Sequence, residues 1–128
     1  MKYLMILVLG SICWGQTLES VPRWSRDKLF VSTMLFSAAA HGIDGFTTAD
    51  MIGPNSRTCP EEIWTPWMYG KHPSPGRVAG VVAVEFGMST GASYLLRKAR
   101  APRWLWMAPM VGQSAIHMRG AIHNLRYC

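Results

Sequence analysis

The sequence predicts an all-α fold, a small helical membrane bundle of three spans that follow an N-terminal hydrophobic signal or anchor. Nearly half of its 128 residues are hydrophobic (49%) and only 16% are charged, which is a low share for a soluble domain of this length. Apolar stretches of helical length recur along the chain, and segments rich in Gly and Pro separate them. The basic residues gather in the short connectors, as they do in membrane proteins.

The composition also bears on the partners. A formal net charge of +6 raises nucleic acid as a partner, but the basic clusters around Arg26 and Arg100 do not form one continuous face. Six Trp and nine Met suit membrane interfaces and adaptable apolar packing. We therefore expect membrane lipid, and no nucleic acid, as the surroundings of this chain.

Residues 1–17 read as a signal peptide or a short anchor. Lys2 precedes an apolar run from Tyr3 to Leu9, and small residues follow, with a plausible cleavage point after Gly15. The run is too short to span a bilayer. Residues 18–128 then form a single helical membrane domain.

The first expected span covers residues 29–52. Its 24 residues would measure about 36 Å, enough to cross the hydrocarbon core with some tilt. Ser25 is the expected N-cap and the Gly53-Pro54 pair the expected stop. At helical spacing one polar stripe forms on this apolar helix, and a stripe of this kind requires a protein partner. Its members are Thr33, Ser37, His41, Asp44 and Thr48.

A connector comes next. It is expected to contain a short surface helix from about Pro60 to Met68, because Thr58-Cys59-Pro60-Glu61 has the form of a capping box.

The second span covers residues 78–96. Small residues recur in it every four positions, which predicts close packing against another helix, with Glu85 and Ser89 beside this ridge. The small-residue ridge consists of Ala79, Ala83, Gly87 and Gly91.

The third expected span covers residues 104–125. The basic turn before it, from Lys98 to Arg103, is so short that the last two spans must form an antiparallel hairpin. Trp104 and Trp106 are expected interface anchors and Pro109 a kink. Gln113 and His117 share one face of this helix with Gly120 and Asn124.

Counting turns from the start of each span places several polar residues at a similar depth, and the cost of inserting charge into a bilayer predicts that they face one another. The candidate polar or ligand cluster consists of His41, Asp44, Thr48, Glu85, Ser89, Gln113 and His117. Such a group could hold a metal through His41, His117, Asp44 and Glu85, clamp a haem between the two His, or relay protons. The simpler interpretation, which we favour, is that these groups only join the helices by hydrogen bonds, with Asp44 bonded to Thr48 or His117.

No phosphate-binding Gly loop, paired-Cys zinc spacing or nucleophile elbow occurs in the sequence. Two Cys follow the N-terminal segment, Cys59 and Cys128, and both could lie on one side of a three-span protein. The sequence leaves open whether they form a disulfide or remain thiols.

Asp44-Gly45-Phe46-Thr47-Thr48, followed by a loop with Glu62 and Pro66 and two more apolar helices, resembles a family of small uncharacterised bacterial multi-span membrane proteins. In that family an Asp-x-x-Thr-Thr first span leads into a Gly and a Glu-x-Asn-Pro loop. Here the loop is one residue longer and has Thr65 where the family has Asn. The resemblance covers about 100 residues and implies a fold and a location in the bacterial inner membrane rather than an activity.

Two features of the sequence predict opposite orientations of the protein in the membrane. A cleaved signal would put Gln16 and the later basic turn outside, whereas the basic clusters favour the cytoplasm. We expect the basic clusters to be cytoplasmic.

The predicted function is non-enzymatic, an association with a second copy or another membrane protein through helix packing. The alternatives are a metal-, haem- or proton-handling site in the bundle, and a secreted soluble helical domain.

Overall fold

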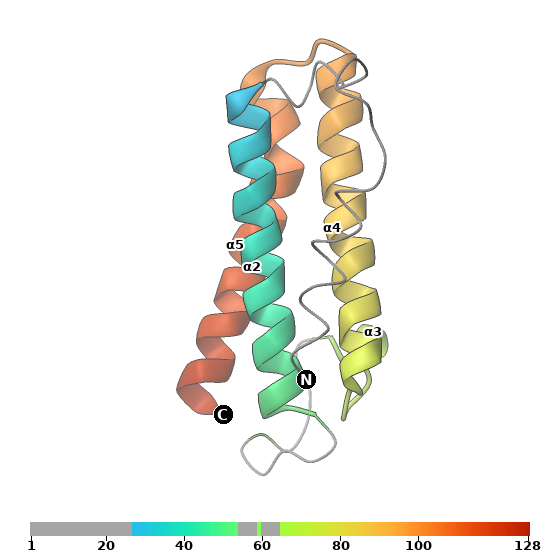
Figure 1. Cartoon of the computed structure of the whole chain (residues 1–128), viewed down its shortest axis with the longest axis vertical. Coiled ribbons are helices and arrows are strands. Elements are labelled where there is room, and N and C mark those ends of the chain that lie inside the picture. The colour runs from blue at the N-terminus through green and yellow to red at the C-terminus, as the bar shows by residue number, and fades with distance from the viewer. Residues whose placement is uncertain (1–26, 54–58, 60–64) are drawn as a thin grey trace, which may run out of the picture. The chain divides into compact units, whose positions relative to one another are not determined.

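The computed structural model describes residues 27–53, 59 and 65–128 (Figure 1), and in this part of the chain every regular element is a helix. The helices are α2 (Lys28–Met51), α3 (Pro66–Tyr69), α4 (Pro75–Lys98) and α5 (Arg103–Tyr127). The predicted all-α fold is confirmed. The chain divides into two compact units, Met1–Val31 and Ser32–Cys128. The expected signal or anchor at residues 1–17 lies outside the described residues.

Helix α2 begins one residue before the expected start. The Asp27 carboxylate accepts hydrogen bonds from the backbone N–H groups of Leu29 (3.0 Å) and Phe30 (3.2 Å), so Asp27 caps the helix. Ser25, the expected cap, lies outside the described residues. The helix ends at Met51, just before the Gly53-Pro54 pair that the sequence marks as a stop.

The connector forms a shorter helix than expected in the part that is described. Helix α3 has only four residues, with Pro66 in its first turn, and the expected capping box is outside the described residues except for Cys59. Gly70 ends α3 with a φ of 85°, a value that favours glycine. Arg77 Nε then donates to the Met68 carbonyl at 2.9 Å and ties the start of α4 to α3.

Helices α4 and α5 form the predicted antiparallel hairpin. Ser74 caps α4 by accepting from the Arg77 N–H at 3.3 Å, and Pro75 occupies the first turn. Four residues separate Lys98 from Arg103, and Arg100 takes a φ of 60° in this turn. Pro109 lies inside α5.

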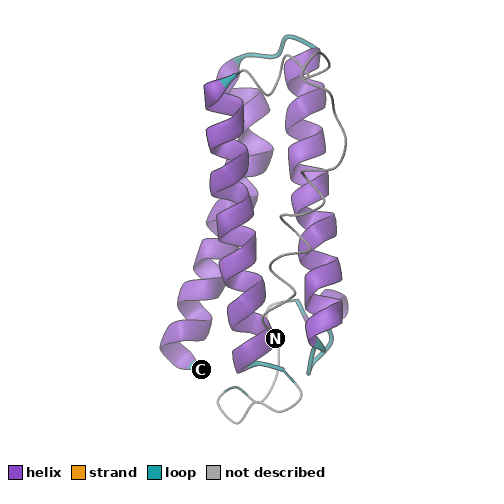
Figure 2. Ribbon diagram, in the orientation of Figure 1, coloured by secondary structure: helices purple, strands orange, loops and turns teal. Residues whose placement is uncertain are grey.

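From Ser32 onward, α2 runs beside both helices of the hairpin (Figure 2). Asp44 is hydrogen-bonded to His117, and Thr48, which follows it on α2, is hydrogen-bonded to Asn124, which follows His117 on α5. Helices α2 and α5 are therefore parallel. Gly45 lies close to Val82, where a Cβ on the glycine would be 3.0 Å from Val82 Cγ2. His41, one turn before Gly45 on α2, contacts Phe86, one turn after Val82 on α4. α2 and α4 are therefore antiparallel, and the polar stripe of α2 is covered.

Two of these helices meet the length and hydropathy needed to cross a membrane, α2 and α4, each with 24 residues and a mean hydropathy of 1.2. Helix α5 is as long, with 25 residues, but is not one of them. The structure thus supports two candidate spans where the sequence predicts three.

Polar side chains share the interior with apolar ones such as Ala40, Met110 and Ala121, and many large apolar side chains are exposed. The buried polar residues of the second unit are Thr33, Ser37, His41, Thr47, Thr48, Ser89, Ser93, Ser114, His117 and Asn124. The exposed apolar residues of the three long helices include Leu35, Phe36, Ile43, Phe46, Val84, Met88, Leu95, Ile116 and Ile122. Buried polar and exposed large apolar side chains in such numbers are unusual for a domain that folds in water.

Within the described residues, the small-residue ridge of α4 does not make the predicted close packing against another helix. Ala79, Ala83 and Gly87 are exposed, and no atom lies within 4 Å of a Cβ built on Gly87 or Gly91. The face that points inward carries Val78, Ser89 and Ser93 instead. This face is preferred because it brings Glu85 to polar partners inside the bundle.

Candidate functional site

Four ionisable side chains meet in the interior, and we call them the central polar cluster: His41 and Asp44 from α2, Glu85 from α4 and His117 from α5. They lie well inside the helices. His117 is 14 residues after the start of α5 and 11 before Cys128, or about 21 Å and 16 Å at 1.5 Å per residue. The sequence placed these four residues at one depth, and the structure brings them into contact.

Asp44 and His117 form the closest pair. His117 Nδ1 lies 2.7 Å from Asp44 Oδ2, with side-chain exposures of 4% and 14%. Because an ionised carboxylate only accepts, Nδ1 carries the proton and donates it. Of the two partners considered for Asp44 from sequence, the structure selects His117. Thr48 instead bonds to Asn124.

Gly120 makes room for this pair. It lies one turn after His117 on α5, and a Cβ at position 120 would meet Asp44 Oδ1 at 2.6 Å. A carboxylate can therefore reach α5 only because position 120 has no side chain. The sequence analysis placed Gly120 on the His117 face without recognising this role.

Glu85 reaches the same imidazole from the other side. Glu85 Oε2 lies 3.5 Å from His117 Nε2 and accepts a hydrogen bond from the Tyr69 hydroxyl at 3.0 Å. Tyr69 belongs to the four-residue helix α3 and is buried. Sequence reasoning missed Tyr69, since a Tyr in a short connector gives no signal of its distant partner.

His41 stacks against His117. The two ring centroids are 3.8 Å apart at an interplanar angle of 37°, and Phe86 packs edge-on against His41 at 5.7 Å. His41 Nδ1 donates to the Ser37 carbonyl at 2.7 Å. The Nε2 atoms of both imidazoles are buried and have no hydrogen-bond partner among the residues that the structure describes.

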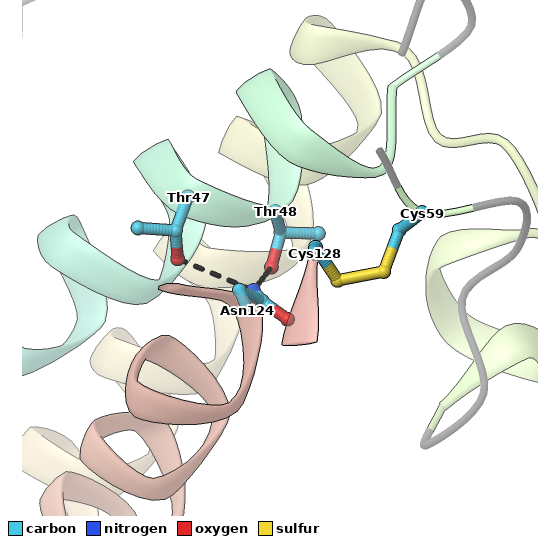
Figure 3. The surroundings of a disulfide bond; sticks show 5 residues. All are labelled: Thr47, Thr48, Cys59, Asn124 and Cys128. Atoms are coloured by element: carbon cyan, nitrogen blue, oxygen red, sulfur yellow. Dashed lines mark hydrogen bonds between the residues drawn. A yellow bond between two sulfur atoms is a disulfide. The ribbon is translucent and has the colours of Figure 1, made fainter. Parts of the chain in front are cut away.

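A second polar layer lies one to two turns farther along α2 and α5 (Figure 3). Asn124 donates to Thr47 Oγ1 at 3.2 Å and to Thr48 Oγ1 at 3.0 Å. Beside it, a disulfide joins Cys59 to Cys128, whose Cα atoms are 4.8 Å apart. The sequence left this pairing open, and it did not include Thr47 in the candidate polar or ligand cluster.

Besides Thr48, which belongs to the second polar layer, two residues of the predicted cluster lie apart from the central polar cluster. Ser89 is buried but donates to the Phe86 carbonyl of its own helix at 3.1 Å. Gln113 is half-buried on α5, one turn before His117. Ser114, its neighbour, is the buried residue at this level and donates to the Met110 carbonyl at 2.6 Å.

The geometry bears on the metal and haem alternatives. Within the described ranges, no three His, Cys, Asp or Glu side chains are grouped so that they could hold a metal ion. A haem held by His41 and His117 would need its macrocycle between the two rings, and rings stacked at 3.8 Å leave no such space. The haem alternative is therefore not compatible with the stacked arrangement of His41 and His117.

Comparisons with protein-family models, with curated proteins and with solved structures find no match to this chain. The resemblance drawn from Asp44, Thr47 and Thr48 stays a prediction. The arguments that follow rest on the contacts of the molecule itself.

Proposed function

We propose that this chain is a small integral membrane protein that acts by association, with α2, α4 and α5 all crossing the bilayer. The observation that carries the proposal is the exposure of large apolar side chains combined with the burial of many polar ones. Leu35, Phe46 and Met88 are 60%, 66% and 70% exposed, whereas Ser37, His41 and Ser114 are at most 1% exposed. Exposed apolar surface of this extent is stable against acyl chains but not against water.

The contacts of α5 support its place as the third span. Asp44 and Asn124 are bonded across the α2–α5 contact, so removing α5 from the bilayer would leave the stripe of α2 facing lipid. Arg119 is exposed on α5 and lies nine residues from Cys128. That is about 14 Å from the end of the helix, a distance from which a long side chain can extend toward the head groups.

The two ends of the hairpin support one orientation. Arg97, Lys98, Arg100 and Arg103 lie at the α4–α5 turn, and the Cys59–Cys128 disulfide lies at the opposite end of α5. Basic loops favour the cytoplasm and disulfides persist in oxidising compartments. Both criteria put the disulfide end outside, which in a bacterial inner membrane is the periplasm.

This orientation has a consequence for the N-terminal segment. Helix α2 runs parallel to α5 and so enters from the basic end, which is cytoplasmic in this proposal. A cleaved signal would start α2 from the other side. The proposal therefore favours a short anchor, or a segment that stays in the cytoplasm, over a signal peptide at residues 1–17.

Membrane extraction and thiol labelling test these steps. We expect the protein to stay with membranes in alkaline carbonate and to need detergent for release, whereas a secreted soluble domain would be released by carbonate. After reduction, Cys59 and Cys128 should react with a membrane-impermeant maleimide in intact cells. Labelling only after lysis would reverse the orientation without affecting the membrane assignment.

For the associating surface, the exposed small-residue ridge of α4 is the face that we propose, and a second copy of the chain is the occupant to test first. Gly87→Leu should reduce energy transfer between donor- and acceptor-labelled copies in bilayers, because a bulky side chain keeps two helices apart. Gly112→Leu is the matched control, since a Cβ at either position meets no atom within 4 Å. Equal transfer in both variants would reject this face.

A further inference from the structure

His117 is held between two carboxylates from different helices. Its Nδ1 donates to Asp44 Oδ2 at 2.7 Å, and its Nε2 faces Glu85 Oε2 at 3.5 Å. Asp44 belongs to α2 and Glu85 to α4, so one imidazole on α5 links all three long helices. The His117 side chain is only 4% exposed, so water does little to screen these contacts.

His117 Nε2 and Glu85 Oε2 are in contact at 3.5 Å but do not form a hydrogen bond. A proton on one of the two atoms makes this contact favourable. With Nδ1 protonated, a neutral imidazole presents a lone pair at Nε2, and an ionised Glu85 presents another at Oε2. Two acceptors facing each other at 3.5 Å repel, and a proton on one of them converts the repulsion into attraction. The Tyr69 hydroxyl already donates to Oε2, so Oε2 acts as an acceptor there and Nε2 is the place for the proton.

We propose that Asp44, His117 and Glu85 form a proton-binding site in which His117 Nε2 takes up one proton from solvent. The step breaks no bond between heavy atoms. The site carries two negative charges before the uptake, one on each carboxylate, and a single net negative charge after it. The bound proton holds α4 against α5, and its release weakens that contact.

The two sides of the site differ in exposure. The Glu85 side chain is 17% exposed, so this is the more open side of the site. On the closed side, the His41 ring stacks on His117, with its own Nε2 buried and without a hydrogen-bond partner in the described part of the chain. His41 thus places a second, neutral acceptor beside the imidazolium. These ionisable groups face His117 from α2 and α4, and Tyr69 completes the site from α3.

Nitrogen-15 spectra of His-labelled protein in nanodiscs at neutral pH test the proposal. Imidazole nitrogens that carry a proton differ strongly in chemical shift from those that do not, and His117→Gln assigns the signal. We expect both His117 nitrogens to carry protons in the unmodified protein. In Glu85→Gln, we expect Nε2 to lose its proton, because the amide can donate to the lone pair.

Thr90→Ala is the matched control on α4, because it alters a half-buried side chain five residues from Glu85 and should leave both nitrogens protonated. A single protonated nitrogen on His117 in the unmodified protein overturns the proposal, even if Glu85→Gln does not fold. Retention of both protons in a folded Glu85→Gln protein also overturns it. The site rests on contacts within the chain, so neither result bears on the orientation in the membrane.

Discussion

Gly120 lies against Asp44, at a distance where a Cβ would come within 2.6 Å of the carboxylate oxygen Oδ1. The same carboxylate bonds through Oδ2 to His117, which lies one turn away on the same helix. The packing of α2 on α5 and the central polar cluster therefore depend on one missing side chain. A change at position 120 tests both.

Gly120→Ala should destabilise the folded protein by about 1–3 kcal/mol, because the new methyl group must displace the Asp44 carboxylate or separate the helices. Gly112→Ala on the same helix is the control. No atom lies within 4 Å of its Cβ position, so the better helix propensity of Ala should leave stability unchanged or raise it by up to about 1 kcal/mol. Reversible unfolding in mixed micelles measures both variants. Equal stability of the two would show that Asp44 does not lie against position 120.

A double-mutant cycle between Asp44 and His117 measures the energy of their contact. The cycle uses Asp44→Ala, His117→Ala and the double variant. Each single change leaves a buried partner without its hydrogen bond, which costs about 1–3 kcal/mol or more for a charged group. We therefore expect the double variant to be more stable than the sum of the two losses, with a coupling of roughly 1–3 kcal/mol. Additive losses would mean that the two side chains do not interact.

The depth of the central polar cluster follows from the sequence because helix rise is constant. Counting residues from Pro- and Gly-marked ends is enough to bring His41, Asp44, Glu85 and His117 to one level. The individual hydrogen bonds of these residues cannot be predicted in the same way. A helical sequence specifies which residues share a face, but not how each helix is rotated about its axis relative to the neighbouring helices.

Helix α4 illustrates this limit. The sequence analysis predicted contacts through both of its faces, the small-residue ridge for helix packing and the face with Glu85 and Ser89 for the polar cluster. The structure turns Glu85 inward, because a carboxylate gains His117 and Tyr69 as partners there. Tyr69 itself lies in a short connector, where no periodicity indicates its direction.

Asn124 offers a test of the second polar layer. Its amide donates to both Thr47 and Thr48, and it is only 3% exposed. Asn124→Ala should lower the free energy of unfolding by about 1–3 kcal/mol, because two buried hydroxyl groups lose a donor. Leu125→Ala, next to it but 61% exposed, should change stability by less than about 1 kcal/mol in the same detergent. A reversed order would place residue 125 rather than Asn124 against α2.

The Cys59–Cys128 disulfide links the two ends of a segment that contains α3, α4 and α5, with a sequence separation of 69 residues. Closing a loop of this length restricts the unfolded chain, and losing the bond should cost roughly 2–4 kcal/mol. Cys128→Ser should therefore lower the unfolding midpoint, and a reducing agent should lower that of the unmodified protein to a similar value. The variant itself should not respond to the reducing agent.

Loss of the disulfide should also affect the end of α5 locally. The Asn124 hydrogen bonds lie within one turn of Cys128, so we expect this end of the helix to fray first. Amide exchange should therefore rise there before it rises at His117. Uniform exchange along α5 in Cys128→Ser would show that the disulfide is not what holds this end of the helix.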